Sequence, residues 1–323
     1  MTDLEIRPAR PEDDDPVQEL FRASLGRKPE DPNEALFAWK HRANTFGESP
    51  AWVAVDGDRI VGYRTFMRWR FVDDEGTTSS AVRAVDTVTS PDCQGRGIFR
   101  RLTLNAVAEL TLAGDRMVFN TPNDQSRPGY LKMGWSVVRH LPVGLLPAGP
   151  AGARRMLTSR VPAKLWSEPI RAGLPARELL ADRTAAEQLL CHAPTKGFRT
   201  DRTPDYLAWR TSLEQLHYRV LPVSAADLAE GGIVFRVRRR GDALEAAVIE
   251  QLVPDWKTGA KLLTRLLKET GADYAIGLRT GPAAGLLPMP LPGFGPILTT
   301  RPLAGSPPAV RDWTLTLGDI ELF

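Results

Sequence analysis

The chain has 323 residues, of which 42% are hydrophobic and 25% are charged, and its formal net charge is +3 at pH 7. This composition is average for a globular protein, so it excludes the disordered and fibrous classes, and the small net charge argues against a dedicated nucleic-acid binder. Because a single core rarely grows to this length, we expect two folded units.

The first 140 residues alternate between strand and helix patterns. A short alternating run at 4–10 precedes a proline and an acidic cluster that begin a helix over 11–25. Two alternating runs within 50–71 meet at Gly57, which predicts a hairpin. The pattern continues with a β-branched strand at 81–91, an amphipathic helix at 97–114, a strand at 115–121, and a helical turn followed by a strand at 126–138.

The second half repeats the first weakly. The matching positions are Arg7 with Arg177, Trp39 with Trp209, Pro91-Asp92 with Pro254-Asp255, and Asp115 with Asp273. These pairs predict two homologous halves. At equivalent positions, Trp39 and Trp209 are interpreted as core or interface anchors rather than platforms for a ligand.

A segment rich in proline, glycine and alanine separates the two halves. We therefore predict one domain at 1–145, a linker at 146–170 and a second domain at 171–323. The tail at 311–323 predicts one last alternating strand.

The two cysteines, Cys93 and Cys191, give no disulfide framework. The first residues lack the pattern of a signal peptide, and no run approaches the ~20 apolar residues that span a bilayer. We therefore expect a cytoplasmic protein that binds neither a membrane nor nucleic acid.

The stretch Gln94-Gly95-Arg96-Gly97 leads from a predicted strand into a predicted helix. Glycine lets the backbone approach a ligand closely, and the unpaired amides and partial positive charge of a helix N-terminus suit a phosphate or pyrophosphate. Arg96, Arg100 and Arg101 can add charge-assisted contacts to the same anion. The alternative is an ordinary glycine-rich turn with solvated arginines.

This order of elements, together with the stretch at 94–97, resembles the GCN5-related N-acetyltransferase (GNAT) superfamily. The family signature is Gln or Arg, two residues, Gly, one residue, then Gly or Ala, and Gln94 and Gly97 match it. Phe99 departs from it, because the family has a small residue there. The resemblance covers about residues 3–140. It implies a mixed α/β fold of the GNAT type, with a tandem, degenerate second half, and acetyl-CoA as the acyl donor.

The resemblance also implies the residues of the site. The strand at 81–91 would carry a bulge and leave backbone groups around Val88 and Thr89 for the pantetheine arm. Asn120 would lie near that arm, with capping of its loop as the alternative. The residues implied at the pyrophosphate are Gln94, Gly95, Arg96, Gly97, Ile98, Phe99 and Arg100.

Tyr130 lies in "RPGYLKMGW", which is similar to the segment whose tyrosine protonates the departing thiolate in the family. A phenol, which titrates near ~10, can donate to a thiolate, whose acid titrates near ~8.5, if the two are within hydrogen-bond reach. The alternative is an amphipathic surface anchor.

A general base for the acceptor amine is less well defined. Asp86 is the first candidate, because it lies two residues before Val88 on the fourth strand and is therefore expected on the same face. The alternative is that Asp86 pairs with Arg83 or another cation. Asp124 is a second candidate. The C-terminal carboxylate of Phe323 is a third, implied by a resemblance to acetyltransferases of the enhanced-intracellular-survival type. Many GNAT enzymes use no single identifiable base.

No metal site is predicted, because His41, His140, His192 and His217 show no ligand spacing. The second half retains neither the glutamine nor the arginine of the loop in "PDWKTGAKLL", so we expect one active site, in the first half. The second half would then form a wall of the acceptor cleft.

The sequence thus predicts an N-acyltransferase that moves an acyl group from acyl-CoA to an amine of a small molecule or peptide. A silent acyl-CoA sensor or scaffold and an aminoacyl-tRNA-dependent transferase of the Fem type are the alternatives. Whether the protein is a monomer or a homodimer stays open.

Overall fold

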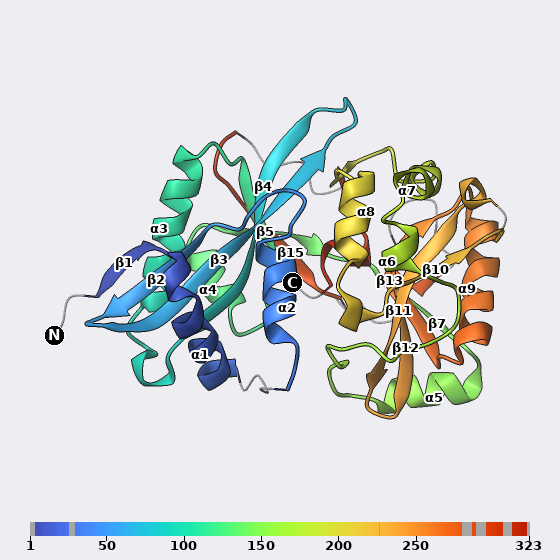
Figure 1. The fold of residues 1–323 in the computed structure, drawn as a ribbon, viewed down its shortest axis with the longest axis horizontal. Coiled ribbons are helices and arrows are strands. Elements are labelled where there is room, and N and C mark those ends of the chain that lie inside the picture. Colours follow the sequence, from blue (N-terminus) through green and yellow to red (C-terminus); the bar gives the residue numbers. More distant parts are fainter. Residues whose placement is uncertain are drawn as a thin grey trace.

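The computed structural model describes residues 4–25, 30–225, 227–279, 286–288, 295–305 and 312–321. Figure 1 shows two parts side by side, each with its own sheet, and helices α2 and α8 where the parts meet. The first part contains β1 (Glu5–Pro8), η1 (Pro11–Asp13), α1 (Asp14–Leu25), α2 (Asn33–His41), β2 (Ala51–Asp56), β3 (Arg59–Val72), β4 (Thr78–Thr89), η2 (Pro91–Cys93), α3 (Ile98–Leu112), β5 (Met117–Asn120), α4 (Arg127–Lys132) and β6 (Ser136–His140).

The rest of the chain builds the second part and returns strands to the first. In chain order its elements are β7 (Val143–Pro147), α5 (Pro150–Thr158), β8 (Leu174–Pro175), α6 (Ala176–Leu179), α7 (Arg183–Leu190), β9 (Phe198–Thr200), α8 (Pro204–Thr211), η3 (Glu214–Leu216), β10 (Arg219–Pro222), η4 (Leu228–Glu230), β11 (Gly232–Arg240), β12 (Ala243–Leu252), α9 (Trp256–Thr270), β13 (Tyr274–Leu278), β14 (Leu287–Pro288), β15 (Ile297–Pro302), β16 (Trp313–Thr314) and η6 (Leu317–Asp319).

The local patterns of the first part form the elements that the sequence predicts. Asp14 and Asp15 begin α1, where carboxylates interact favourably with the helix dipole. Gly57, with a φ of +64°, turns β2 into the antiparallel β3, and β4 follows as the next antiparallel strand. The mixed α/β class is therefore confirmed.

The two sheets have the same strand order. The main run of the first is β1-β2-β3-β4-β5-β15-β6, and the second runs β8-β10-β11-β12-β13-β7-β14; the first sheet also contains β9, paired with β3, and β16, paired with β9. In each sheet the fourth and fifth strands of this order are parallel, β4 with β5 and β12 with β13. This correspondence agrees with the predicted repeat.

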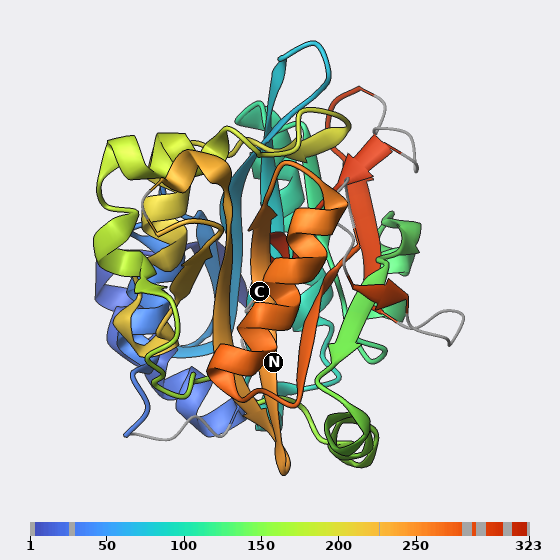
Figure 2. The ribbon, with the colours of Figure 1, turned by 90° about the vertical axis from the view of Figure 1, so that its right-hand side faces the viewer.

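The halves exchange a strand. β15, drawn in red in Figure 2, lies between β5 and β6 and is antiparallel to both. β7 lies in the corresponding place of the second sheet, antiparallel to β13 and β14. The division at residues 145 and 170 stays a prediction, but the sheets do not follow it, because a strand from each side of the division belongs to the other sheet.

The structure adds detail to two local expectations. The segment at 146–170 is not simply a connector, because it contains helix α5, whose Gly152 packs against the backbone of Asp273. The tail does not form one long strand. In its described residues β16 spans only two residues, and a 3-10 turn, η6, follows.

Helices cover both faces of the first sheet. Apolar residues of α1 pack with Val53, Tyr63 and Val88 on one face, and those of α3 pack with Ala54 and Phe66 on the other. The alternation along β2 to β4 provides both sets. None of the helices within the described ranges is both long and apolar enough to span a membrane.

A third cluster joins the two parts. Trp39 of α2 and Trp209 of α8 stack at 5.3 Å between ring centroids, and the indole nitrogen of each donates to the other's carbonyl oxygen at 2.7 and 2.8 Å. Both are buried in a core cluster that also contains Trp69 and Trp313. The interpretation of these tryptophans as core anchors agrees with this geometry.

Candidate active site

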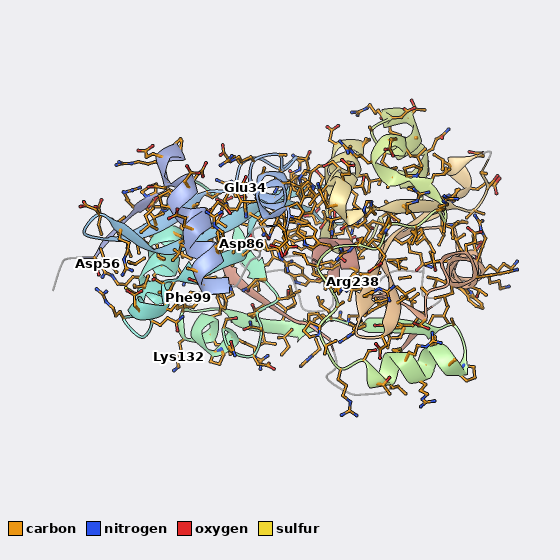
Figure 3. All side chains as sticks on the ribbon, turned by 60° about the horizontal axis from the view of Figure 1, so that its bottom comes forward. Glu34, Asp56, Asp86, Phe99, Lys132 and Arg238 are labelled. Carbon is orange, nitrogen blue, oxygen red and sulfur yellow. The ribbon has the colours of Figure 1, made fainter. Side chains whose placement is uncertain are left out.

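A cavity of about 830 Å³ opens between the ends of β4 and β5, the loop before α3, and helix α4. It brings together most of the residues that the sequence singles out. These lining residues are Asp86, Thr89, Gln94, Gly95, Gly97, Ile98, Phe99, Arg100, Asn120 and Tyr130. Figure 3 shows two of them, Asp86 and Phe99, in the N-terminal part, with Arg238 in the other part.

The cavity exists because β4 and β5 separate. The two strands pair through Ala81, Val82 and Arg83 on β4, so β4 after Arg83 has no strand partner on that side among the described residues. On its other side β4 has a bulge: the register with β3 skips Asp86, whose φ is +42°. The bulge at Asp86 thus lies two residues before Val88, where the resemblance implies free backbone groups for the pantetheine arm.

The backbone of the loop before α3 is open. Gly95 and Gly97 have φ of +78° and +74°, and a Cβ at either position would meet nothing within 4 Å. Gly97 is the N-cap of α3 and offers no side chain to the first amides of that helix. These amides can therefore receive an anion.

The three arginines of this region point to different partners. Arg96 donates to Asp56 at 2.7 Å, and Arg101 donates to the carbonyl oxygen of Leu4 at 2.9 Å, and neither lines the cavity. Arg100 does line it. Of the three predicted anion contacts, the structure brings only Arg100 to the cavity wall.

Phe99 packs against α4. Its ring lies edge-on to Tyr130 at 5.4 Å between centroids, and a Cβ on Gly129 would lie 3.2 Å from its Cε1 atom. The large side chain at 99 is therefore accommodated by the absence of a side chain at 129. Both residues line the cavity.

Tyr130 is held by Arg64 of β3. The phenol is 4% exposed, so the surface-anchor alternative is not supported. Its oxygen accepts a hydrogen bond from Arg64 Nη2 at 2.8 Å, and Arg64 also donates to Thr87 Oγ1. The hydroxyl hydrogen of Tyr130 is thus left for another acceptor.

Residues 5–138 match the family model described as the acetyltransferase (GNAT) domain. This stretch of the chain is a GNAT domain. This domain belongs to the GNAT-type acyltransferases, whose acyl donor is acyl-CoA. A comparison with curated protein sequences found no significant match.

Solved structures share the fold over nearly the whole chain. A probable N-acyltransferase from Enterococcus faecalis aligns with a TM-score of 0.63 at 12% identity, covering 94% of this chain and 73% of that one. A GCN5-related N-acetyltransferase from Anabaena variabilis gives 0.63 at 13% identity, with the same coverage. Eis1 from Mycobacterium abscessus gives 0.54 at 12% identity, covering 93% of this chain and 74% of that one. At these identities the likeness concerns the fold.

In the GNAT domain, the side chains of Asn120 and Val88 lie in different places. Asn120 lines the cavity, and its Oδ1 accepts from Thr299 Oγ1 of the exchanged strand β15 at 2.6 Å. The side chain of Val88 packs in the core beneath α1 instead. A backbone contribution from Val88 stays a prediction.

Asp86 pairs with a cation, as the alternative of Arg83 or another cation predicts, and that cation is Lys40. Its Oδ2 lies 2.6 Å from Lys40 Nζ and 2.9 Å from His41 Nε2, both buried on α2. Burial by itself would raise the pKa of Asp86, but the ammonium of Lys40 and the hydrogen bond with His41 outweigh it and hold the pKa well below its usual range. Asp86 is therefore a charged group at the cavity wall.

The other candidates for a base lie elsewhere. Asp124 is 90% exposed at its side chain, forms an ion pair with Arg127 and does not line the cavity. Phe323 lies outside the described residues. Among the residues that the structure describes, no cluster of His, Cys, Asp and Glu side chains could hold a metal ion.

The second part differs at the helix that corresponds to α3. The N-cap of α9 is Asp255, whose carboxylate accepts from the amides of Lys257 and Thr258 at 2.8 and 2.9 Å. These bonds lower the pKa of Asp255. A charged carboxylate occupies the place that an anion would take, so this helix is unsuited to a phosphate.

Sequence reasoning did not name Arg64 and gave Arg83 no role in the site, but both are buried arginines at the cavity wall. Arg83 donates to Thr121 Oγ1 and to the carbonyl oxygen of Asp319, each at 2.8 Å, and burial lowers its pKa to about 9. The available signal was an arginine inside a run of apolar strand residues, in "VGYRTF" and "AVRAVD". A charged residue at such a position needs a partner or a function.

Proposed function

We propose that the protein is an N-acetyltransferase, which passes an acetyl group from acetyl-CoA directly to an amine of a small molecule or peptide. The observation that supports this most is the single cavity that unites the open glycine loop, the separated strands and Tyr130. The residues present suit acetyl-CoA, because a bare backbone at Gly95 and Gly97 leaves room for a pyrophosphate at the start of α3.

In this proposal each wall of the cavity has one task. The amides that follow Gly97, with Arg100, bind the pyrophosphate, and the unpaired edge of β4 near Thr89 binds the pantetheine arm as a missing strand would. Asn120, fixed by Thr299, contacts the same arm. Acetyl-CoA supplies the activated acyl group as a thioester.

Tyr130 is proposed as the general acid. Its hydroxyl keeps a hydrogen to donate because its oxygen already accepts from Arg64. Protonation of the leaving sulfur by a positioned phenol contributes roughly 10²–10⁴-fold to a rate. Tyr130 would give its proton to sulfur as the C–S bond breaks.

Asp86 is proposed to face the acceptor amine at the bulge of β4. Because Lys40 and His41 keep it ionised, it is a weak proton acceptor and is better suited to attract the ammonium form of the substrate. The amine would then lose its proton to solvent. Asp124 is too exposed to compete for this role.

We further propose that the reaction takes place in the cytoplasm and that only the GNAT domain is active. The carboxylate cap on α9 is the observation that supports a single active site. Monomer and homodimer both remain open.

The test is thermal unfolding with acetyl-CoA. At about 100 times its Kd, a ligand stabilises by ~2.7 kcal/mol, which is several degrees in Tm. Gly97→Glu should abolish the shift, because it places a carboxylate against the phosphates. Gly76→Glu is the matched control, since Gly76 also has a positive φ, +80°, and open space around it, but lies in the β3–β4 turn.

The outcome also separates the alternatives. A protein that shows no shift with any acyl-CoA is not the proposed enzyme, and a Fem-type transferase would behave in this way. A silent scaffold would show the shift but release no CoA with any member of a panel of amines.

A further inference from the structure

Arg64 is a buried cation on the wall of the acyl-CoA cavity. The residue is 1% exposed. Its guanidinium donates to the hydroxyl oxygens of Thr87 and Tyr130, and it lies over three aromatic rings, at 4.5 Å from the centroid of Phe66, 5.4 Å from Tyr130 and 5.6 Å from Phe99. All of these partners are neutral.

Two other buried arginines of this chain have carboxylate partners. Arg202 pairs with Glu250 and Asp319, and Arg236 pairs with Glu321 at 2.5 Å. Among the described residues no acidic side chain forms an ion pair with Arg64, and its buried Nε has no hydrogen-bond partner there. Cation–π contacts compensate only part of the cost of burying a charge.

An uncompensated cation in a cavity is suited to a ligand that brings negative charge. The end of the cavity near Tyr130 is where the proposed function puts the thioester sulfur. When the C–S bond breaks, this sulfur acquires a full negative charge.

We propose that Arg64 is the counter-ion for the charge released at the CoA sulfur and the positioning residue for Tyr130. This inference rests on the proposed function. The acceptor ammonium loses one proton to solvent before attack and a second as the N–C bond forms and the C–S bond breaks, Tyr130 gives its proton to sulfur, and solvent returns one to Tyr130. Arg64 balances the single negative charge while it lies on sulfur or on the phenol oxygen.

The inference predicts that the site prefers CoA in its ionised form. CoA should then bind more tightly than desulfo-CoA, which lacks the thiol, by at least about tenfold at pH 8, or ~1.4 kcal/mol. Because a thiol titrates near ~8.5 when free, the affinity for CoA should rise as pH rises toward that value. The affinity for desulfo-CoA should not follow this rise.

The experiment is isothermal titration of the full chain with CoA and with desulfo-CoA between pH 6.5 and 8.5. Arg64→Met should bring the ratio of the two affinities close to one and remove its pH dependence. Arg64→Lys, which keeps the charge, should retain part of the preference. Arg100→Met is the matched control: as a proposed pyrophosphate contact, its loss should weaken both ligands equally and leave the ratio unchanged.

The outcomes separate this inference from the proposed function. If neither ligand binds, the proposed function fails. If both bind equally well to the wild type at every pH, or if Arg64→Met retains the wild-type ratio, the role of Arg64 is overturned while CoA binding stands. Should both Arg64 variants fail to fold, the pH dependence of the wild-type ratio decides alone.

Discussion

Asp86 shows how the role of one residue depends on its contacts. Its φ of +42° is a left-handed conformation that costs a non-glycine residue roughly 1–2 kcal/mol. The ion pair with Lys40 and the hydrogen bond with His41 hold it there at the bulge of β4. The same contacts keep it charged, which favours the binding of an ammonium group over the removal of its proton.

We predict that Asp86→Asn lowers the free energy of unfolding by about 3 kcal/mol at pH 7, because it removes the carboxylate from two buried partners. Since the folded-state pKa of Asp86 lies below its unfolded value of ~3.9, its contribution is complete above that pH and is lost as pH falls below it. Urea unfolding at pH 7 and pH 3 measures both effects. A variant as stable as the wild type at pH 7 would contradict the account.

Tyr130→Phe should reduce turnover by roughly 10²-fold or more, with the affinity for acetyl-CoA nearly unchanged. The reason is that only the hydroxyl that protonates sulfur is removed, while the ring keeps its contacts with Phe99 and Trp135. Steady-state kinetics and acetyl-CoA titration measure the two quantities. Tyr274→Phe, which removes a buried hydroxyl bonded to Glu245 in the second part, is the control and should affect stability but not turnover.

At the scale of elements, α3 and α4 form the site by packing on each other. The start of α3 carries Phe99, and the first turn of α4 carries Gly129. The two helices meet where the ring of Phe99 lies against Gly129, which has no side chain. This contact also fixes the ring of Tyr130. The departure from the family pattern at 99 is therefore linked to the glycine at 129.

We predict a measurable coupling between these two positions. Gly129→Val should destabilise the protein by overpacking against Phe99, and Phe99→Ala should destabilise it by leaving a cavity. The double variant should be more stable than the sum of the single changes predicts, by about 1–2 kcal/mol. Additive changes in a thermal double-mutant cycle would show that the contact is not shared.

At the scale of the whole molecule, the two parts are joined by more than one linker. The first sheet contains β9, β15 and β16 from the second half of the chain, and the second sheet contains β7. A core cluster also runs across the boundary, and the stacked Trp39 and Trp209 bond reciprocally. The C-terminal segment adds buried ion pairs, in which Asp319 and Glu321 bind arginines of the second part. The parts are thus expected to unfold as one cooperative unit.

A fragment of residues 1–141 should consequently fail to fold alone. It lacks β15, so β5 and β6 would lose the strand between them and expose unpaired edges. Circular dichroism and size-exclusion chromatography should show aggregated or unfolded material, and co-expression with residues 142–323 should restore a soluble complex. A soluble fragment that binds acetyl-CoA would refute the need for the exchange.

The sequence by itself determined the local elements and the loop. Hydrophobic periodicity, the glycine of the β2–β3 turn and the Gln94–Gly97 stretch are read from neighbouring residues, so the strands, α3 and most of the cavity lining could be predicted. Tertiary structure alone decided which strand pairs with which, and therefore the exchange of β7 and β15. It also decided that Lys40 and His41 reach Asp86, and that Arg64 is buried against Tyr130. These contacts join residues far apart in the chain, and no local pattern records them, because the backbone of a strand pairs equally well with many partners until packing selects one.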